Sequence, residues 1–458
     1  MTNREPIPSS FRDPSGFIFI ENGEIFRQIN FSYKENYDSL IESGLLKNLV
    51  DKNLLVSHEE VKNSENSDSY KIIKPKKIEY ISYPYEWSFS QLKDAALLTL
   101  RTQRIALKHN MSLKDASSYN VQFLDGKPIF IDSLSFEKYQ EGLPWVAYRQ
   151  FCQHFLAPLL LMKYSNINLN QLLRVYLDGI PLDIANSILP LKAKFNFSVF
   201  LHISLHSKTQ KKLENTDVKF SKNAKLTKAK LLDIVENLED LIGNISLPKS
   251  QTEWGEYYTF TNYSDSAFSN KKKIIEGFLD KINPKTLWDL GANNGLFSRI
   301  ASNRKIKTVA FDIDPIAVEK NYLQIKNSKE TDILPLVLDL TNPSPSIGFA
   351  NEERPSFSQR SETDVIMALA LIHHISISNN VPFVKVAKYF AQMTNYLIIE
   401  FVPKSDSQVK KLLATREDVF PRYNQNGFEQ YFSQYFSIVD SVKIEDCDRV
   451  LYLMKKNS

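Results

Sequence analysis

Cysteine and glycine are both scarce in this sequence. Its 458 residues include two cysteines and 13 glycines. Cys152 and Cys447 lie far apart, which excludes a disulfide framework and a cysteine-based zinc site. His202 and His206 have the His-x-x-x-His spacing of zinc proteases, but Ile203 stands where such a protein carries its glutamate. The sequence therefore predicts no metal site.

Long apolar runs and a strong net charge are also absent. The longest apolar run, residues 155–162, is too short to cross a membrane. Residues 1–12 are polar and contain no secretory signal, so the expected location is the cytoplasm. A net charge of +4 is too small for a chain of this size to indicate a nucleic-acid partner by itself.

A lysine-rich polar stretch divides the chain. Residues 205–230 are typical of a solvated linker, and their basic and aromatic residues are not interleaved as in a nucleic-acid groove. Residues 231–245 then place apolar residues at helical spacing. We therefore expect an α+β domain over residues 1–204, a lysine-rich linker and helix over residues 205–250, and another domain over residues 251–458.

The C-terminal domain alternates short apolar runs with amphipathic stretches. This alternation is typical of βαβ units and predicts an α/β fold, a Rossmann-like, doubly wound parallel sheet. Such a sheet binds ligands beyond the carboxyl ends of its strands. The expected strands are residues 286–290, 307–312, 334–340, 364–369 and 395–401.

Two of the few glycines stand together where the first expected strand ends. Gly291 and Gly295 flank a turn that also holds Asp289 and Asn293. Glycine is used where the backbone turns sharply or where a ligand approaches it closely, and an ordinary strand–helix turn also fits this pattern. Neither a Gly-x-Gly-x-x-Gly pattern nor a phosphate-loop lysine is present, so a pyrophosphate ligand is not expected.

Acidic residues end the next two expected strands. Asp312 stands where an acid in such folds binds ribose hydroxyls, and Asp339 with Leu340 ends the third strand. Acids at the ends of three successive parallel strands face one crevice, which favours a nucleoside-like ligand.

The motifs DLGANNG, VAFDID, LVLDL and DVIMALALIHH together resemble the class I S-adenosylmethionine-dependent methyltransferases over residues 250–458. The resemblance implies S-adenosyl-L-methionine as cofactor. The resemblance implies that the 289–295 turn lies at the methionine end of this cofactor. It implies that Asp312 binds the ribose and that Asp339 and Leu340 lie near the adenine. The whole chain also resembles bacterial proteins, described as methyltransferases, that are related to the rhizobial nodulation protein NoeA. Four stretches suggest this: YISYPYEWSFSQLKDAALLTL, LKDASSYNVQF, PWVAYRQFCQHFLAPL and EFVPKSDSQVKKLLATREDVF.

Two histidines follow the fourth expected strand. His373 and His374 lie near the expected position of the methyl group, where an imidazole suits the role of general base. Hydrogen bonding at the end of the sheet is an equally good interpretation for each. The acceptor is a glycan, a small metabolite or a protein side chain. The oligomeric state is left open.

Three polar residues in the N-terminal domain suggest a second chemistry. Asp115, Asn120 and Asp132 have the spacing of the catalytic and metal-binding loops of protein-kinase-like folds. The chain departs from that pattern, because neither a glycine-rich loop nor a Val-Ala-x-Lys strand precedes them. One interpretation is a degenerate, kinase-like domain that recognises the acceptor. The alternative is a phosphotransferase or nucleotide-binding module with a methyltransferase-like appendage.

Overall fold

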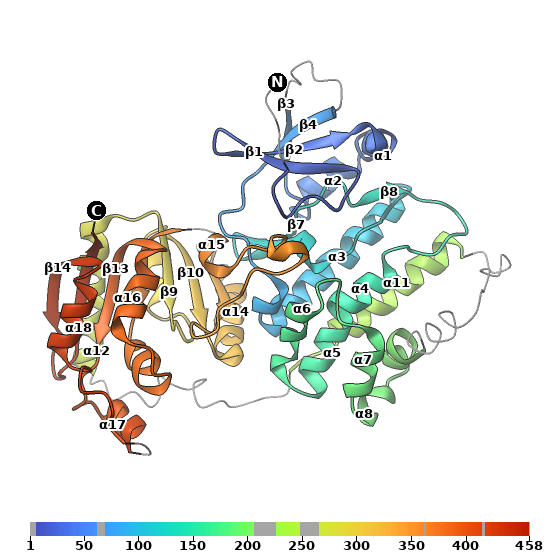
Figure 1. Ribbon diagram of the computed structural model, residues 1–458. Helices are drawn as coiled ribbons and strands as arrows, with labels where there is room; N and C mark the ends of the chain where they lie inside the picture. Colours follow the sequence, from blue (N-terminus) through green and yellow to red (C-terminus); the bar gives the residue numbers. More distant parts are fainter. Residues whose placement is uncertain are drawn as a thin grey trace. The chain divides into compact units, whose positions relative to one another are not determined.

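The computed structural model describes residues 6–61, 69–205, 226–247, 265–360, 362–414 and 417–457 (Figure 1). These residues form two compact units. The first unit comprises Met1–Lys249 with Ser346–Arg354, and the second comprises Ser250–Pro345 with Pro355–Ser458. Most of the lysine-rich stretch, residues 206–225, lies outside the described residues.

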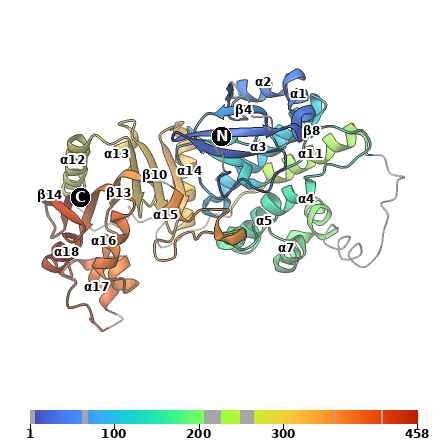
Figure 2. The ribbon, with the colours of Figure 1, turned by 45° about the horizontal axis from the view of Figure 1, so that its top comes forward.

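The first unit begins with a four-stranded antiparallel sheet of order β1-β2-β4-β3, whose strands are labelled in Figure 1 and seen from another side in Figure 2. The hairpin of β1 and β2 turns at Asn22 and Gly23, whose φ values of 53° and 77° suit a tight turn. Gly16 pairs with Ile29 across this hairpin. The elements of this part are β1 (Gly16–Glu21), β2 (Glu24–Asn30), η1 (Phe31–Tyr33), α1 (Lys34–Glu42), α2 (Leu45–Asp51), β3 (His58–Val61) and β4 (Ser69–Pro75).

The rest of the first unit is mainly helical around α3 (Phe89–Lys108). Ser88 caps this helix, because its side chain accepts a hydrogen bond from the backbone N–H of Gln91. Two short antiparallel pairs follow, β5 with β8 and β6 with β7. The elements are η2 (Pro84–Glu86), β5 (Met111–Leu113), η3 (Ser118–Asn120), β6 (Val121–Leu124), β7 (Lys127–Phe130), β8 (Phe136–Lys138), α4 (Tyr148–Phe151), η4 (Cys152–Leu156), α5 (Ala157–Tyr164), η5 (Ile167–Gln171), α6 (Leu172–Val175), α7 (Leu182–Ile188), α8 (Leu191–Lys194), α9 (Phe197–Val199), η6 (Phe200–Leu205) and α11 (Lys228–Gly243).

The helix expected after the lysine-rich stretch is α11, and it packs along α3. Lys93 of α3 donates hydrogen bonds from Nζ to the carbonyl oxygens of Gly243 and Ile245, at 2.8 and 2.7 Å. Arg104 of α3 forms an ion pair with Glu239 at 3.4 Å. The helix is therefore part of the first unit's fold.

The second unit contains a seven-stranded sheet of order β11-β10-β9-β12-β13-β15-β14. Strands β9 to β13 are parallel, and β15 is antiparallel to both of its neighbours. The doubly wound α/β sheet predicted from the sequence is confirmed. Its elements are α12 (Asp265–Ile282), β9 (Thr286–Leu290), α13 (Ser298–Ser302), β10 (Lys307–Asp312), α14 (Pro315–Ser328), β11 (Ile333–Val337), η8 (Phe349–Asn351, assigned to the first unit), α15 (Phe357–Arg360), β12 (Thr363–Ala368), η9 (His374–Ser378), α16 (Phe383–Ala391), β13 (Thr394–Phe401), α17 (Ser407–Leu413), α18 (Gln425–Phe432), β14 (Phe436–Lys443) and β15 (Val450–Lys456).

Helices cover both faces of this sheet. Ile275 of α12 and Ile300 of α13 share one core cluster with Leu451 of β15. The next residue of β15, Tyr452, points to the opposite face, where its ring lies 5.1 Å from that of Phe428 in α18. The sheet therefore lies between two helical layers, which do not cover the ends of its strands.

None of the described helices is long and apolar enough to cross a membrane.

Candidate functional site

A cavity of about 460 Å³ opens at the carboxyl ends of the parallel strands of the second unit. β9 lies between β10 and β12, and the chain winds outward from β9 in opposite directions, so the cavity lies at the switch point of the sheet. Most of the residues predicted from the sequence line it, namely Asp289, Gly291, Asn293, Asp312, Asp339, Leu340 and His374. Gly295 and His373 are not among the lining residues.

The turn after β9 needs its two glycines for different reasons. Gly291 and Gly295 both have positive φ, 78° and 77°. A Cβ on Gly291 would lie 3.1 Å from Leu371 Cδ1 at the edge of the cavity. A Cβ on Gly295 would lie 2.4 Å from the side-chain nitrogen of Asn321 and 2.8 Å from that of Arg299. Gly295 therefore packs closely against α14 and is not among the residues that line the cavity.

Asp312 ends β10 and is fixed by the backbone. Its Oδ2 accepts a hydrogen bond from the N–H of Asn293 at 2.7 Å, and its Oδ1 accepts one from Asp314 at 2.9 Å. Burial raises the pKa of Asp312 to about 6, although these backbone donors favour the charged form. Each carboxylate oxygen has a further lone pair, so the group retains acceptor capacity toward the cavity.

Asp289 lies inside the sheet end and is more strongly perturbed. Burial, together with the negative charge of Asp312, raises its pKa to about 7, while the hydrogen bond from Ser298 Oγ at 2.6 Å lowers it. Two buried carboxyl groups therefore line one wall of the cavity. Such a wall favours a ligand that brings positive charge.

Asp339 lies beyond the end of β11 and is more accessible than the other two acids. The third strand ends at Val337, not at Leu340 as predicted. Asp339 Oδ1 accepts hydrogen bonds from the backbone N–H and the hydroxyl of Thr341, at 2.8 and 2.7 Å, and these bonds turn the chain out of the sheet.

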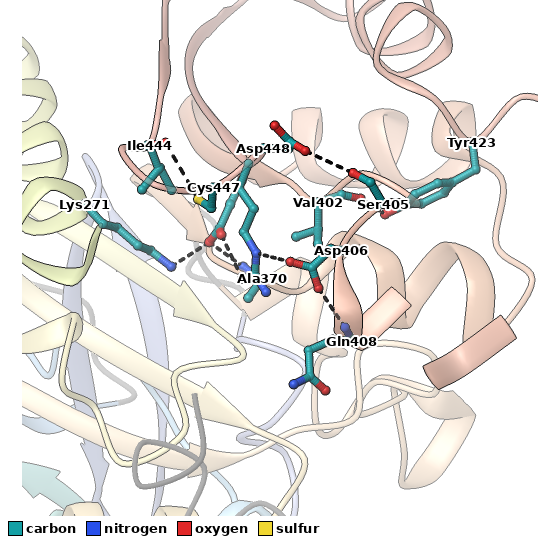
Figure 3. A network of polar contacts seen from close by, with 12 residues as sticks. Lys271, Ala370, Val402, Ser405, Asp406, Gln408, Tyr423, Ile444, Cys447 and Asp448 are labelled. Atoms are coloured by element: carbon teal, nitrogen blue, oxygen red, sulfur yellow. Dashed lines mark hydrogen bonds and ion pairs between the residues drawn. The ribbon is translucent and has the colours of Figure 1, made fainter. Parts of the chain in front are cut away.

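A buried charge network borders the cavity (Figure 3). Lys271 of α12 lines the cavity, and its Nζ lies 2.6 Å from Oε2 of the fully buried Glu400. Glu400 also accepts hydrogen bonds from the backbone N–H of Ala370 at 2.9 Å and from Arg449 at 3.1 Å. Arg449 Nε in turn donates to Asp406, the N-cap of α17, at 2.8 Å. The network thus joins the ends of β12 and β13 to α12, α17 and β15.

Lys271 was missed by the sequence reasoning, although a signal was present. Ala267 and Ile275, four residues to either side, are buried, so Lys271 falls on the apolar face of a helix. A lysine on such a face needs a buried partner. Burial lowers its pKa, while the charge of Glu400 raises it.

The two histidines after β12 differ in position. His374 lines the cavity, and burial, together with Arg449, lowers its pKa. His373 is buried and its Nδ1 has no hydrogen-bond partner among the described residues. The ring centroids lie 4.1 Å apart. Of the pair, only His374 is placed to reach a ligand in the cavity.

The three polar residues of the first unit also come together. Asp115 and Asn120 lie in the segment between β5 and β6, and Asp132 follows β7. Burial, with the nearby charge of Asp132, raises the pKa of Asp115, and Asn120 hydrogen-bonds to it. Arg27 of β2 forms an ion pair with Asp132 at 2.5 Å and is itself buried. The Arg27 guanidinium therefore compensates the negative charge of Asp132, the carboxylate that a magnesium ion would need as a ligand.

The histidine pair considered for zinc is only partly described. His202 is buried, with Nδ1 2.6 Å from the hydroxyl of Tyr148 and Nε2 2.8 Å from Oδ1 of Asn237. His206 lies outside the described residues. Within the described ranges, no group of three or more histidine, cysteine, aspartate or glutamate residues could hold a metal ion.

Solved structures similar to this chain include three methyltransferases, all with low TM-scores. N-methyltransferase NodS from Bradyrhizobium japonicum WM9 is 10% identical, with 43% of this chain and 99% of that chain covered and a TM-score of 0.33. Magnesium protoporphyrin IX methyltransferase (ChlM) from Synechocystis PCC 6803 is 13% identical, with 42% and 84% covered and a TM-score of 0.31. The bifunctional kinase-methyltransferase WbdD is 13% identical, with 42% of this chain and only 40% of its own chain covered and a TM-score of 0.31.

Sequence comparison gives a much closer relative. No family model matches the chain. The nodulation protein NoeA of Rhizobium meliloti (strain 1021) is 34% identical over 461 residues, which cover 98% of this chain and 96% of NoeA. The protein described here therefore belongs to the NoeA family, as its sequence suggested.

Proposed function

We propose that the protein is an S-adenosylmethionine-dependent methyltransferase. The observation that carries the proposal is the cavity at the switch point, with Asp289, Asp312 and Lys271 on its wall and no phosphate-binding loop beside it. The cofactor's sulfonium and ammonium groups are cations, its carboxylate is an anion and its ribose carries paired hydroxyls. Each of these groups has a matching side chain at the cavity.

Residues of this chain would hold the cofactor at both ends. Asp312 accepts hydrogen bonds from the ribose hydroxyls while its backbone donors keep the carboxylate in place. Lys271 attracts the carboxylate of the methionine part of the cofactor. Asp289 compensates the positive charge of the ammonium group in the same part. Asp339 and Leu340 border the adenine. Backbone at Gly291 lies against the amino-acid tail.

When bound, S-adenosylmethionine supplies a methyl group on a sulfonium centre that an in-line nucleophile can accept. The protein then has to align the acceptor and exclude water. His374 is neutral near pH 7 because its pKa is lowered, so it can take a proton from an acceptor hydroxyl. The proposed acceptor is a glycan, a small metabolite or a protein side chain.

The test is calorimetric titration of S-adenosylmethionine into the wild-type protein and into Asp312→Ala. Charge-assisted hydrogen bonds contribute roughly 1.5–3 kcal/mol each. Losing two of them, about 3–6 kcal/mol together, should weaken binding by at least about 100-fold, since each ~1.4 kcal/mol is one decade.

Asp314, two residues on, supplies the matched control. Its side chain caps α14 by accepting the N–H of Ile316 at 2.8 Å, so Asp314→Ser keeps a capping residue while removing a charge. This variant should bind nearly as well as the wild type. Equal losses in both variants, or no binding by the wild type, would contradict the proposal.

A further inference from the structure

An apolar surface lies on the helical part of the first unit, over α8, α9 and the start of η6. Leu191, Phe195, Phe197 and Phe200 are 75%, 87%, 75% and 39% exposed. We call these four residues the 191–200 face. Single exposed apolar side chains are normal in proteins, whereas a large contiguous patch of them marks an interaction surface.

The segment that carries this face is folded against the rest of the first unit, and only one of its sides is exposed. Leu189, Ala193 and Val199 alternate with the exposed residues and are at most 3% exposed. Just beyond the face, buried His202 hydrogen-bonds to Asn237 of α11. The chain therefore buries one apolar side and presents a second apolar side outward.

The charges within this segment are all of one sign. From residue 184 to residue 205, the only charged residues are Lys192 and Lys194, and neither forms an ion pair with another described residue. Their ammonium groups alternate along the chain with Leu191 and Phe195. A partner must therefore offer an apolar interior and a negatively charged rim.

We infer that the 191–200 face docks the protein on an anionic phospholipid surface. Phenylalanine and leucine side chains bury in the boundary between headgroups and acyl chains, and lysines next to them attract anionic headgroups. A second copy of the same face offers only positive charge, which disfavours self-association. A single-stranded nucleic acid would be held through phosphate contacts, for which residues 184–205 offer only Lys192 and Lys194.

The experiment is flotation of the full-length protein with two kinds of vesicle, phosphatidylcholine alone and equal parts of phosphatidylcholine and phosphatidylglycerol. The wild type should float with the anionic vesicles and much less with the neutral ones. Phe195→Ser with Phe197→Ser should weaken the partition coefficient by at least about tenfold. Lys192→Gln with Lys194→Gln should weaken it by roughly 30-fold, since each lysine near an anionic surface contributes about fivefold.

The control is Val439→Ser, which removes a side chain that is 54% exposed on β14 of the second unit. This variant should float like the wild type. Circular dichroism checks that each variant is folded, and the lysine pair keeps the test valid if the phenylalanine pair disturbs folding. The inference is overturned by absence of flotation or by equal loss in the control. It is also overturned if the face variants change only the sedimentation coefficient or the binding of a single-stranded oligonucleotide.

Discussion

At the scale of single residues, the acids of the cavity link ligand binding to pH. The pKa values of Asp289 and Asp312 are raised to about 7 and about 6, so both carboxyl groups take up protons on folding. Their contribution to stability is fully present near pH 4 and is lost as pH rises toward 7. A cationic ligand reverses this loss because it favours the charged carboxylates.

We therefore expect S-adenosylmethionine to raise the melting temperature more at pH 8 than at pH 5.5. The reason is that binding at the lower pH must first remove protons from Asp289 and Asp312. Thermal unfolding with and without ligand, over this pH range, measures the effect. Asp289→Asn should flatten the dependence between pH 6 and 8, and a ligand-induced shift that does not vary with pH would contradict the linkage.

The two histidines should separate chemistry from packing. His374→Ala should leave S-adenosylmethionine affinity nearly unchanged and slow methyl transfer by about 100-fold or more, if this imidazole is the general base. His373→Leu should retain most of the transfer rate, because His373 does not line the cavity. Transfer of a tritiated methyl group into a dialysed cell extract gives the rates. Full activity in His374→Ala would assign the base elsewhere.

Residues at the ends of strands could be predicted from the sequence, whereas the side chains that they contact in the folded protein could not. Asp312 could be placed because it ends an apolar run. That Gly295 packs on Asn321 could not be predicted, because Asn321 lies in α14, beyond α13 and β10, and only the folded chain brings it near. Glu400 lies within the strand predicted at residues 395–401, but its role at the centre of a buried network depends on Lys271 and Arg449, which are distant in sequence.

At the scale of elements, the five parallel strands of the second unit were predicted from the sequence. Their apolar runs are buried on both faces or alternate regularly, so periodicity was informative. The antiparallel strands β14 and β15 were not predicted, since β14 is a largely exposed edge strand with weak alternation. The helix after β9 begins at Ser298, because residues 291–297 form the turn that precedes it.

The network around Glu400 joins several of these elements, and we predict that Glu400→Gln destabilises the second unit. The change leaves Lys271 and Arg449 buried with only part of their negative partners, and breaking a buried pair costs about 3–5 kcal/mol. Equilibrium urea unfolding should show a loss of this order.

The matched control is Asp440→Asn, which removes the ion pair of Asp440 with Lys281 on the surface. Exposed pairs contribute about 0–1 kcal/mol, so this variant should unfold nearly as the wild type does. A Glu400→Gln protein as stable as Asp440→Asn would show that the buried charges are not interdependent.

At the scale of the whole molecule, the sequence predicts an N-terminal and a C-terminal domain on either side of residues 205–250. The assignment of Ser346–Arg354 to the first unit could not, because it depends on contacts distant in sequence. Arg12 Nε lies 2.6 Å from Oε1 of the buried Glu353, and the guanidinium of Arg354 lies 4.5 Å from the ring centroid of Tyr119. Local patterns carry no information on such pairs.

The first unit also holds the residues behind the second activity that the sequence left open, phosphotransfer. Asp115, Asn120 and Asp132 lie together as a phosphotransfer site requires, yet Arg27 already compensates Asp132. Magnesium and the guanidinium would compete for one carboxylate, and no glycine-rich loop is present to hold phosphates.

We therefore predict that the full-length protein does not hydrolyse ATP with magnesium and that Asp132→Ala leaves methyl transfer within about twofold of the wild type. Phosphate release and label transfer measure the two activities. Arg27→Gln is a second test variant, because it removes the ion pair of Asp132 while keeping a polar side chain at position 27. Tighter magnesium binding by this variant than by the wild type would show that the guanidinium blocks the metal. Magnesium-dependent ATP turnover by the wild type that Asp132→Ala eliminates would instead make the first unit a phosphotransferase.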